Sequence, residues 1–238
     1  MDRALNVRAP AGVDVRWIRG IGWSPARRHT DAVEKALDWG AELILIFGAD
    51  QVPEEDLLER LYARVLEGYL PVCALVPARG YFENNVGSKP FSRLAWRWTS
   101  TKLDENGKPI VRPYRNQTLD PDMMELVKPD GKMQVVHMIG SGCIMFHRDH
   151  ILALKKPWFS ETFDKETYRR AATMDTYFSW RLNAEASAQI WCDTSIRIGH
   201  LSDILIDESF QDRFDDWMDP KTKNTEPDII KHKETIKA

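Results

Sequence analysis

The sequence has 238 residues, with 33 Lys and Arg against 36 Asp and Glu, so its formal net charge is −3. A dedicated nucleic-acid-binding protein carries a clear basic excess, so this balance argues against a nucleic-acid partner. No stretch of about 18 apolar residues is present, and we therefore expect no membrane span. The length and the hydrophobic content of 43% suit one large domain with its own core.

The cysteines indicate the cellular compartment in which the protein is found. Cys73, Cys143 and Cys192 each lie in an apolar run, and three residues cannot all pair within one chain. This pattern favours buried, reduced thiols. The N-terminus lacks the apolar core of a signal peptide, so the sequence predicts a cytoplasmic protein.

The first predicted element is a helix over residues 24–40. Ser24 can cap it, Pro25 suits its first turn, and Gly40 suits its C-terminal end. The all-apolar run 42–47 then predicts a strand buried on both faces, as in a parallel sheet.

A second helix is predicted to begin at Pro53 and to end at Gly68, with three acidic residues, 54–56, in its first turn. Residues 70–76 form another apolar strand. Residues 42–76 are therefore predicted to be a β-α-β unit.

Residues 80–134 break the regular pattern with many glycines, prolines and aromatic side chains. A long irregular segment inside a compact domain is usually functional or mobile. Trp96 and Trp98 lie in it and could stack on sugar rings or belong to the core.

Regularity returns in the last third, where Gly140, Ser141 and Gly142 separate two apolar strands. The glycines allow the backbone to approach a ligand closely, although a bend between strands would look the same. The predicted strands and helices lie, in order, at 135–139, 143–147, 148–154, 173–187, 189–192 and 196–198. The charged tail 219–238 predicts a frayed helix or a disordered end.

Three residues are candidates for chemistry, and each also has a structural explanation. Asp50 follows a buried strand, where ligands of α/β sheets bind, but it is also an ordinary turn residue. Asp175 lies near the start of a helix. It could be a general base, or an acidic residue that the helix dipole stabilises. His200 follows a strand and a glycine. It could be a ligand, or a histidine whose hydrogen bonds are satisfied within the fold. The other histidines have no mutual spacing that suggests a site.

Arg27 and Arg28 lie in the first turns of the first helix, where their charges oppose the helix dipole. They could face a phosphate, although solvated arginines are commoner. The sequence contains no HExxH, GxSxG, P-loop or GxGxxG motif.

In their order along the chain, these pieces resemble the family 2-like GT-A glycosyltransferases. The segment GAELILIFGADQVPEEDLLERL is similar to the family's apolar strand, Asp-x-Asp motif and amphipathic helix. The segments IGSGCIMFHRDHILAL and MDTYFSWRLNAEASAQIWCDTSIRIGHL are similar to its C-terminal half. The resemblance covers residues 24–76 and 135–201. It implies a single α/β domain of GT-A fold over 1–218, with a mostly parallel central sheet flanked by helices.

The resemblance also implies roles for residues. Asp50 matches the last Asp of Asp-x-Asp, which helps to hold a divalent metal, Mn²⁺ or Mg²⁺, on the donor diphosphate. His200 matches a histidine that completes the metal site, and Asp175 matches the base that deprotonates the acceptor hydroxyl. The remaining residues implied for nucleotide-sugar binding are Arg27, Arg28, Gln51, Gly140, Ser141 and Gly142.

The sequence departs from the family pattern at three places. Gly48 replaces the first Asp of Asp-x-Asp, and Met174 replaces the Glu of a Glu-Asp pair. The first strand and base-gripping loop of the family are missing before residue 24, where Val13–Ile18 could be the family's second strand.

The expected function is metal-dependent, inverting transfer from a UDP-sugar to an unknown hydroxyl acceptor, with 80–134, including Trp96 and Trp98, on the acceptor side. Two alternatives stay open. One is a catalytically weak or inactive nucleotide-sugar-binding module, and the other is a nucleotidyltransferase on a related α/β core.

Overall fold

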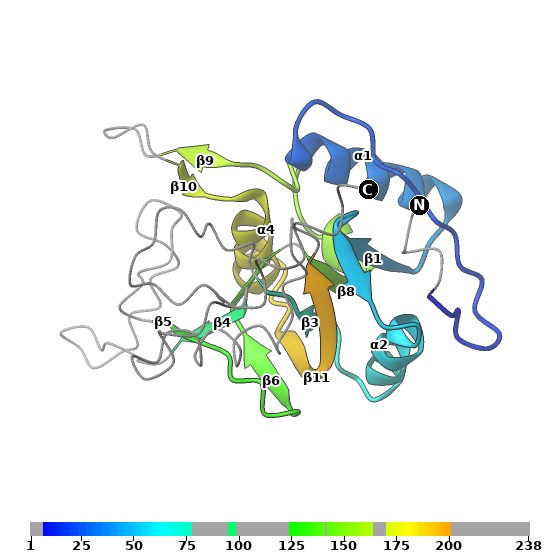
Figure 1. Cartoon of the computed structure of the whole chain (residues 1–238). Helices are drawn as coiled ribbons and strands as arrows, with labels where there is room; N and C mark the ends of the chain where they lie inside the picture. The colour runs from blue at the N-terminus through cyan, green and yellow to red at the C-terminus, as the bar shows by residue number, and fades with distance from the viewer. Residues whose placement is uncertain (1–6, 78–94, 99–123, 141, 164–169, 201–238) are drawn as a thin grey trace, which may run out of the picture.

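The computed structural model describes residues 7–77, 95–98, 124–140, 142–163 and 170–200 (Figure 1). The helices are α1 (Pro25–Trp39), α2 (Leu57–Leu66), α3 (Arg148–Leu152) and α4 (Met174–Ala184). The strands are β1 (Leu43–Phe47), β2 (Gln51–Pro53), β3 (Val72–Leu75), β4 (Ala95–Trp98), β5 (Met124–Leu126), β6 (Met133–Val136), β7 (Met138–Ile139), β8 (Cys143–His147), β9 (Thr162–Phe163), β10 (Arg170–Ala172) and β11 (Ile190–His200).

The central sheet is mixed. Its strand order is β1-β8-β3-β11-β2, and β6 pairs with the other half of β11. The expectation of an α/β domain is confirmed, but the expectation of a mostly parallel sheet is wrong, because β3 and β11 make the one parallel pairing in this sheet. The physical reason is that β8 inserts between β1 and β3 and runs antiparallel to both, which separates the two strands of the predicted β-α-β unit.

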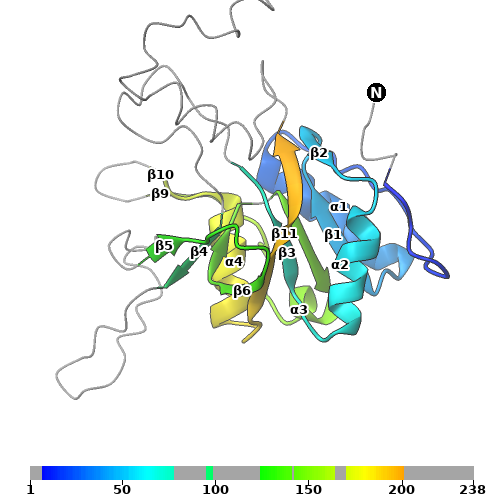
Figure 2. The same ribbon diagram turned by 60° about the horizontal axis from the view of Figure 1, so that its bottom comes forward.

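Helices cover both faces of this sheet (Figure 2). On one face, α1 and α4 bury Val33, Phe178 and Leu182 against alternate strand residues such as Ile144 and Phe146. On the other face, α2 buries three leucines against the residues of β3, β8 and β11 that point the opposite way. All three cysteines are buried and unpaired, as expected.

The first helix agrees with its prediction. The Oγ of Ser24 accepts a hydrogen bond from the backbone N–H of Arg27, and Gly40 ends the helix with a φ of 89°. A φ in this region is one that glycine adopts without strain. Val13–Ile18, in contrast, forms no regular strand.

The predicted start of the second helix, at Pro53, is wrong. Residues 51–53 form the short edge strand β2, and α2 begins at Leu57. Pro53 is tolerated because an edge strand can lack one donor. The apolar run 135–139 is likewise divided, since β6 pairs with β11 whereas β7 pairs with β4.

Several expectations fall outside the described residues. They are the tail 219–238, the domain boundary at 218, Ser141 and most of 80–134. Among the helices that the structure describes, none has the length and apolar character needed to cross a bilayer.

Candidate functional site

The site is built where three strands end. β8 runs antiparallel to both β1 and β3, and β3 runs parallel to β11, so β1, β3 and β11 all point the same way. Their carboxyl ends therefore share one edge of the sheet. Asp50 follows β1, Pro77 follows β3, and His200 is the last residue of β11.

Asp50 and His200 meet at this edge. The Nε2 atom of His200 lies 3.3 Å from the Oδ2 atom of Asp50. The Nδ1 atom of His200 lies 2.8 Å from the carbonyl oxygen of Pro77. Because a carbonyl oxygen only accepts, Nδ1 must carry the hydrogen, and a neutral imidazole then directs its Nε2 lone pair at the carboxylate.

This arrangement suits a cation. A neutral His200 and an ionised Asp50 would place two acceptors face to face, which is unfavourable without a proton or a metal ion between them. Carboxylate oxygen and imidazole nitrogen are ligand types that Mn²⁺ accepts, and Mg²⁺ prefers oxygen. Across the described parts of the chain, no group of three or more His, Cys, Asp or Glu side chains is placed to hold a metal. The pair would thus supply two protein ligands.

A tight turn places Asp50. The backbone N–H of Gln51 donates to the carbonyl oxygen of Gly48 at 3.1 Å, which closes the turn after β1. β2 then pairs antiparallel with the end of β11, and Gln51 stands opposite His200 in the register. The same pairing that interrupts the predicted second helix therefore brings the aspartate and the histidine together.

Two glycines are required by the packing of this turn. A Cβ at position 48 would lie 2.8 Å from the Oδ1 atom of Asp50, so the glycine that departs from the family motif leaves room for the carboxylate. A Cβ at position 142 would lie 2.1 Å from the Nε2 atom of Gln51. At Gly142 the backbone thus lies close to the side chain of Gln51.

Gln51 supports the turn from within the sheet. Its side chain is 3% exposed, and its Oε1 atom accepts a hydrogen bond of 3.2 Å from the backbone N–H of Gly48. Gly140 is also buried. The nucleotide-sugar contacts predicted for these residues stay predictions, and the described geometry gives Gln51 a positioning role.

Asp175 lies in the first turn of α4, after the N-cap Thr173. The N-terminal end of α4 lies toward the sheet edge at which β11 ends (Figures 1 and 2). Its neighbour from α1 is His29: burial lowers the pKa of His29, while the Pro25 carbonyl and the charge of Asp175 act in the opposite direction. The His29 ring packs on Phe159 with centroids 5.4 Å apart.

Arg27 and Arg28, in the first turn of α1, contact the segment that precedes the helix. The Nε atom of Arg28 donates to the carbonyl oxygen of Gly22 at 2.9 Å, and the side chain of Arg27 packs on the same glycine. Both residues are exposed. No described contact joins them to Asp50 or His200, so their phosphate-binding role stays a prediction.

Trp96 and Trp98 lie in β4, which pairs with β5 and β7 in a separate sheet. Their side chains fall outside the described part of the structure, so the acceptor role is untested. Sequence reasoning missed one contributor to the site, the Pro77 carbonyl, which no side-chain pattern could signal.

The chain matches none of the known protein-family models, and no curated protein matches it. Among solved structures, it is similar to A197 from STIV. The identity is 15%, over 76% of this chain and 69% of that chain, with a TM-score of 0.45. A likeness at this level carries no argument about function.

Proposed function

We propose that this protein transfers a sugar from a nucleotide-sugar donor, most simply a UDP-sugar, on a GT-A-type fold. The observation that carries the proposal is the 3.3 Å approach of Asp50 to His200 at the carboxyl edge of the sheet. Both residues match metal-site positions of the family that the sequence resembles, and β2 brings them together across 150 residues of chain.

The donor set fits a divalent cation bound to a diphosphate. One carboxylate and one imidazole leave most coordination positions for phosphate oxygens and water, as is usual for Mg²⁺ and Mn²⁺. Such a cation offsets the negative charge that develops on a diphosphate leaving group. Pro77 holds the histidine tautomer that presents its lone pair, which is how ligating histidines are commonly oriented.

We assign Asp175 the role of general base. Its carboxylate accepts the proton of the acceptor hydroxyl while the hydroxyl oxygen forms a bond to the anomeric carbon. The bond from that carbon to the diphosphate oxygen breaks, and the diphosphate leaves with the electron pair. A single displacement of this kind inverts the anomeric configuration. The support is positional: the half-buried Asp175 begins a helix whose N-terminal end lies toward the edge that holds Asp50.

The metal assignment is tested by calorimetric titration of the full chain with UDP, with and without Mn²⁺. UDP is expected to bind more tightly with Mn²⁺ present. Asp50→Asn and His200→Gln are each expected to weaken this binding by about tenfold or more, because each removes one of two protein ligands.

Asp149→Asn is the matched control. Asp149 also pairs with a histidine, since its Oδ2 atom lies 3.3 Å from the Nδ1 atom of His147, but it begins α3 and is 79% exposed. Its variant should bind Mn²⁺–UDP as the parent chain does. Mn²⁺-independent binding of UDP, or unchanged binding in Asp50→Asn, would show that the metal assignment is wrong.

Turnover separates an enzyme from a binding module. Release of UDP from a panel of UDP-sugars is measured for the parent chain and for Asp175→Asn. We expect the variant to keep its Mn²⁺–UDP affinity and to lose about a hundredfold or more in rate. Binding without turnover in the parent chain would favour the non-catalytic alternative, and full turnover in Asp175→Asn would remove Asp175 from the role of base.

A further inference from the structure

Residues 16–24 form an extended segment, here called the strap, that lies along α1 without pairing in any described sheet. Its burial alternates along the chain. Ile18, Gly20 and Gly22 face the body of the protein, and the residues between them face solvent. The outward residues are Trp17, Arg19, Ile21 and Trp23.

The strap is fixed in place by α1. The backbone N–H of Ile21 donates to the Oδ2 atom of Asp31 at 2.8 Å. The carbonyl oxygen of Gly22 accepts from Arg28 at 2.9 Å. The backbone of Gly20 lies so close to α1 that a Cβ there would stand 1.9 Å from the carbonyl oxygen of Arg28. The small residues of the strap therefore serve the contact with the helix.

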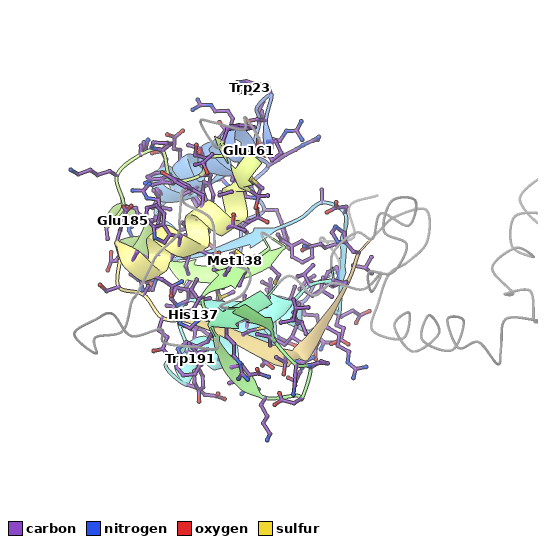
Figure 3. All side chains as sticks on the ribbon, turned by 90° about the vertical axis from the view of Figure 1, so that its left-hand side faces the viewer. Trp23, His137, Met138, Glu161, Glu185 and Trp191 are labelled. Carbon is purple, nitrogen blue, oxygen red and sulfur yellow. The ribbon has the colours of Figure 1, made fainter. Side chains whose placement is uncertain are left out.

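The large apolar side chains of the strap point away from the protein. Trp17 is 43% exposed, Ile21 is 70% exposed and Trp23 is 91% exposed. Figure 3 shows Trp23 at the outer end of the molecule. Single exposed apolar residues are normal, but several on one face of one ordered segment mark an interaction surface.

All the charged side chains of the strap and of the first turn of α1 are positive. Residues 16–28 contain four arginines and no acidic residue, in a chain whose net charge is −3. The nearby Asp31 is already paired with Lys35 at 2.6 Å. Beside the strap, an open hollow of about 610 Å³ is lined by Arg16, Arg19 and Lys35 together with Trp17 and Trp39, and Asp38 is its one acid.

We propose that the strap docks this protein on the surface of an anionic lipid bilayer. Trp and Ile side chains on a narrow ridge can enter the headgroup region without a matching pocket, and tryptophan favours that region. Arginines beside them keep their charge at the level of the lipid phosphates. The hollow offers Arg16 and Arg19 to phosphate groups next to the ridge. The protein would lie on the membrane and not span it.

Two other partners fit less well. A protein partner usually needs about 800 Å² on each side, which a ridge of this width does not offer without further surface. A nucleic acid fits less well because Ile21, at the centre of the ridge, gives no aromatic face for stacking.

Vesicle co-sedimentation of the full chain tests the proposal. Vesicles of phosphatidylcholine alone are compared with vesicles that contain about one third phosphatidylserine. Binding is expected with the anionic vesicles and is expected to fall as salt rises, because exposed charges are screened. Trp23→Ser and Ile21→Ser should each weaken binding by about tenfold, and Arg19→Ala by about fivefold.

Leu66→Ser is the matched control, because Leu66 is 72% exposed on α2, outside the strap. It should leave vesicle binding unchanged, as should Asp50→Asn, so failure here is distinct from failure of the proposed function. Absence of binding to anionic vesicles would overturn the proposal. So would equal binding by Trp23→Ser, or binding of single-stranded RNA in place of vesicles through the same residues.

Discussion

At the scale of single residues, the environment of Asp50 is set by contacts too close for most side chains. The backbone N–H of Gly48 donates to the carbonyl oxygen of Gly142 at 3.2 Å and also to the side chain of Gln51. Gln51 and Val76 fill the space in which Gly142 would otherwise carry a side chain. The turn that places Asp50 thus depends on close contacts among Gly48, Gln51 and Gly142.

Gly142→Ala is expected to destabilise the protein by about 1–3 kcal/mol, the usual effect of overpacking a core. Its Cβ would lie 2.1 Å from the Nε2 atom of Gln51 and 2.7 Å from the nearest methyl of Val76, and both side chains are buried. Urea unfolding measures the change. Adding Gln51→Ala should restore part of the loss, since it removes the closest atom. A Gly142→Ala variant with parental stability would contradict this packing.

At the scale of elements, β11 is the strand that organises the sheet. Its first half pairs with β3 and β6, and its end pairs with β2. Between the halves, the register with β3 shifts between Asp193 and Arg197. Arg60 from α2 donates to the carbonyl oxygen of Ser195 at 2.8 Å, which satisfies the backbone at this irregularity.

Asp193 fixes α2 to this irregular part of β11. Its carboxylate is 1% exposed and accepts from the Nε atom of Arg64 at 2.7 Å and from the backbone N–H of Ser195 at 2.9 Å. Burial by itself raises the pKa of Asp193, but the hydrogen bonds from Ser195 and Arg64 outweigh it and hold the pKa below its usual value. The ionised form is therefore the one that the fold stabilises.

Asp193→Ala is expected to cost about 2–3 kcal/mol of unfolding free energy, because it leaves the buried backbone N–H of Ser195 and the Nε of Arg64 without their acceptor. Glu67→Ala is the matched control. Glu67 pairs with the same arginine at 2.8 Å, but its side chain is 48% exposed. That change should cost less than about 1 kcal/mol. Equal losses in the two variants would show that burial does not decide the strength of these pairs.

The elements also show what the sequence could predict. The first helix was predictable because its caps are local: Ser24 and Gly40 each form their capping hydrogen bonds with residues a few positions away in the sequence. β2 was not, because residues 51–53 form a strand through pairing with the distant end of β11. The two strands predicted at 189–192 and 196–198 are one strand. Arg64 and Arg60 of α2 donate to the side chains of Asp193 and Ser195, and Thr194 between them donates to Asp130 and to the carbonyl oxygen of Lys132.

The candidate site was likewise predictable from the sequence only in part. Asp50 and His200 could each be proposed from their place after a strand, and the resemblance joined them. Their contact depends on the register of β2 with β11. The insertion of β8, which made the sheet mixed, has no local signal, because an apolar strand has the same pattern in either direction.

At the scale of the whole molecule, burial of histidines links stability to pH. Burial lowers the pKa of His29, His137 and His150 below the ordinary value of 6.5. They lie in three different parts of the fold: His29 in α1, His137 between β6 and β7, and His150 in α3. In each case the folded protein disfavours the imidazolium, whereas the unfolded chain takes up the proton freely.

The protein is therefore expected to lose stability as the pH falls through about 6.5 and below. In that range the unfolded chain binds more protons than the folded one, so the unfolding free energy decreases with decreasing pH. The carboxylates act in a separate range: the pKa of Asp193 and of Asp31 is lowered from 3.8, so their contribution is present above that value and is lost only in stronger acid. Thermal melts should therefore show a lower melting temperature at about pH 5.5 than at about pH 7.5.

His137→Gln tests the cause, because burial lowers the pKa of His137. The variant keeps a polar side chain of similar length but cannot take up a proton in this range, so the difference between its melting temperatures at the two pH values should be smaller than in the parent chain. A parent chain that melts at the same temperature at both pH values would mean that these histidines reach solvent in the folded state, since only a pKa that differs between the folded and unfolded states makes stability depend on pH.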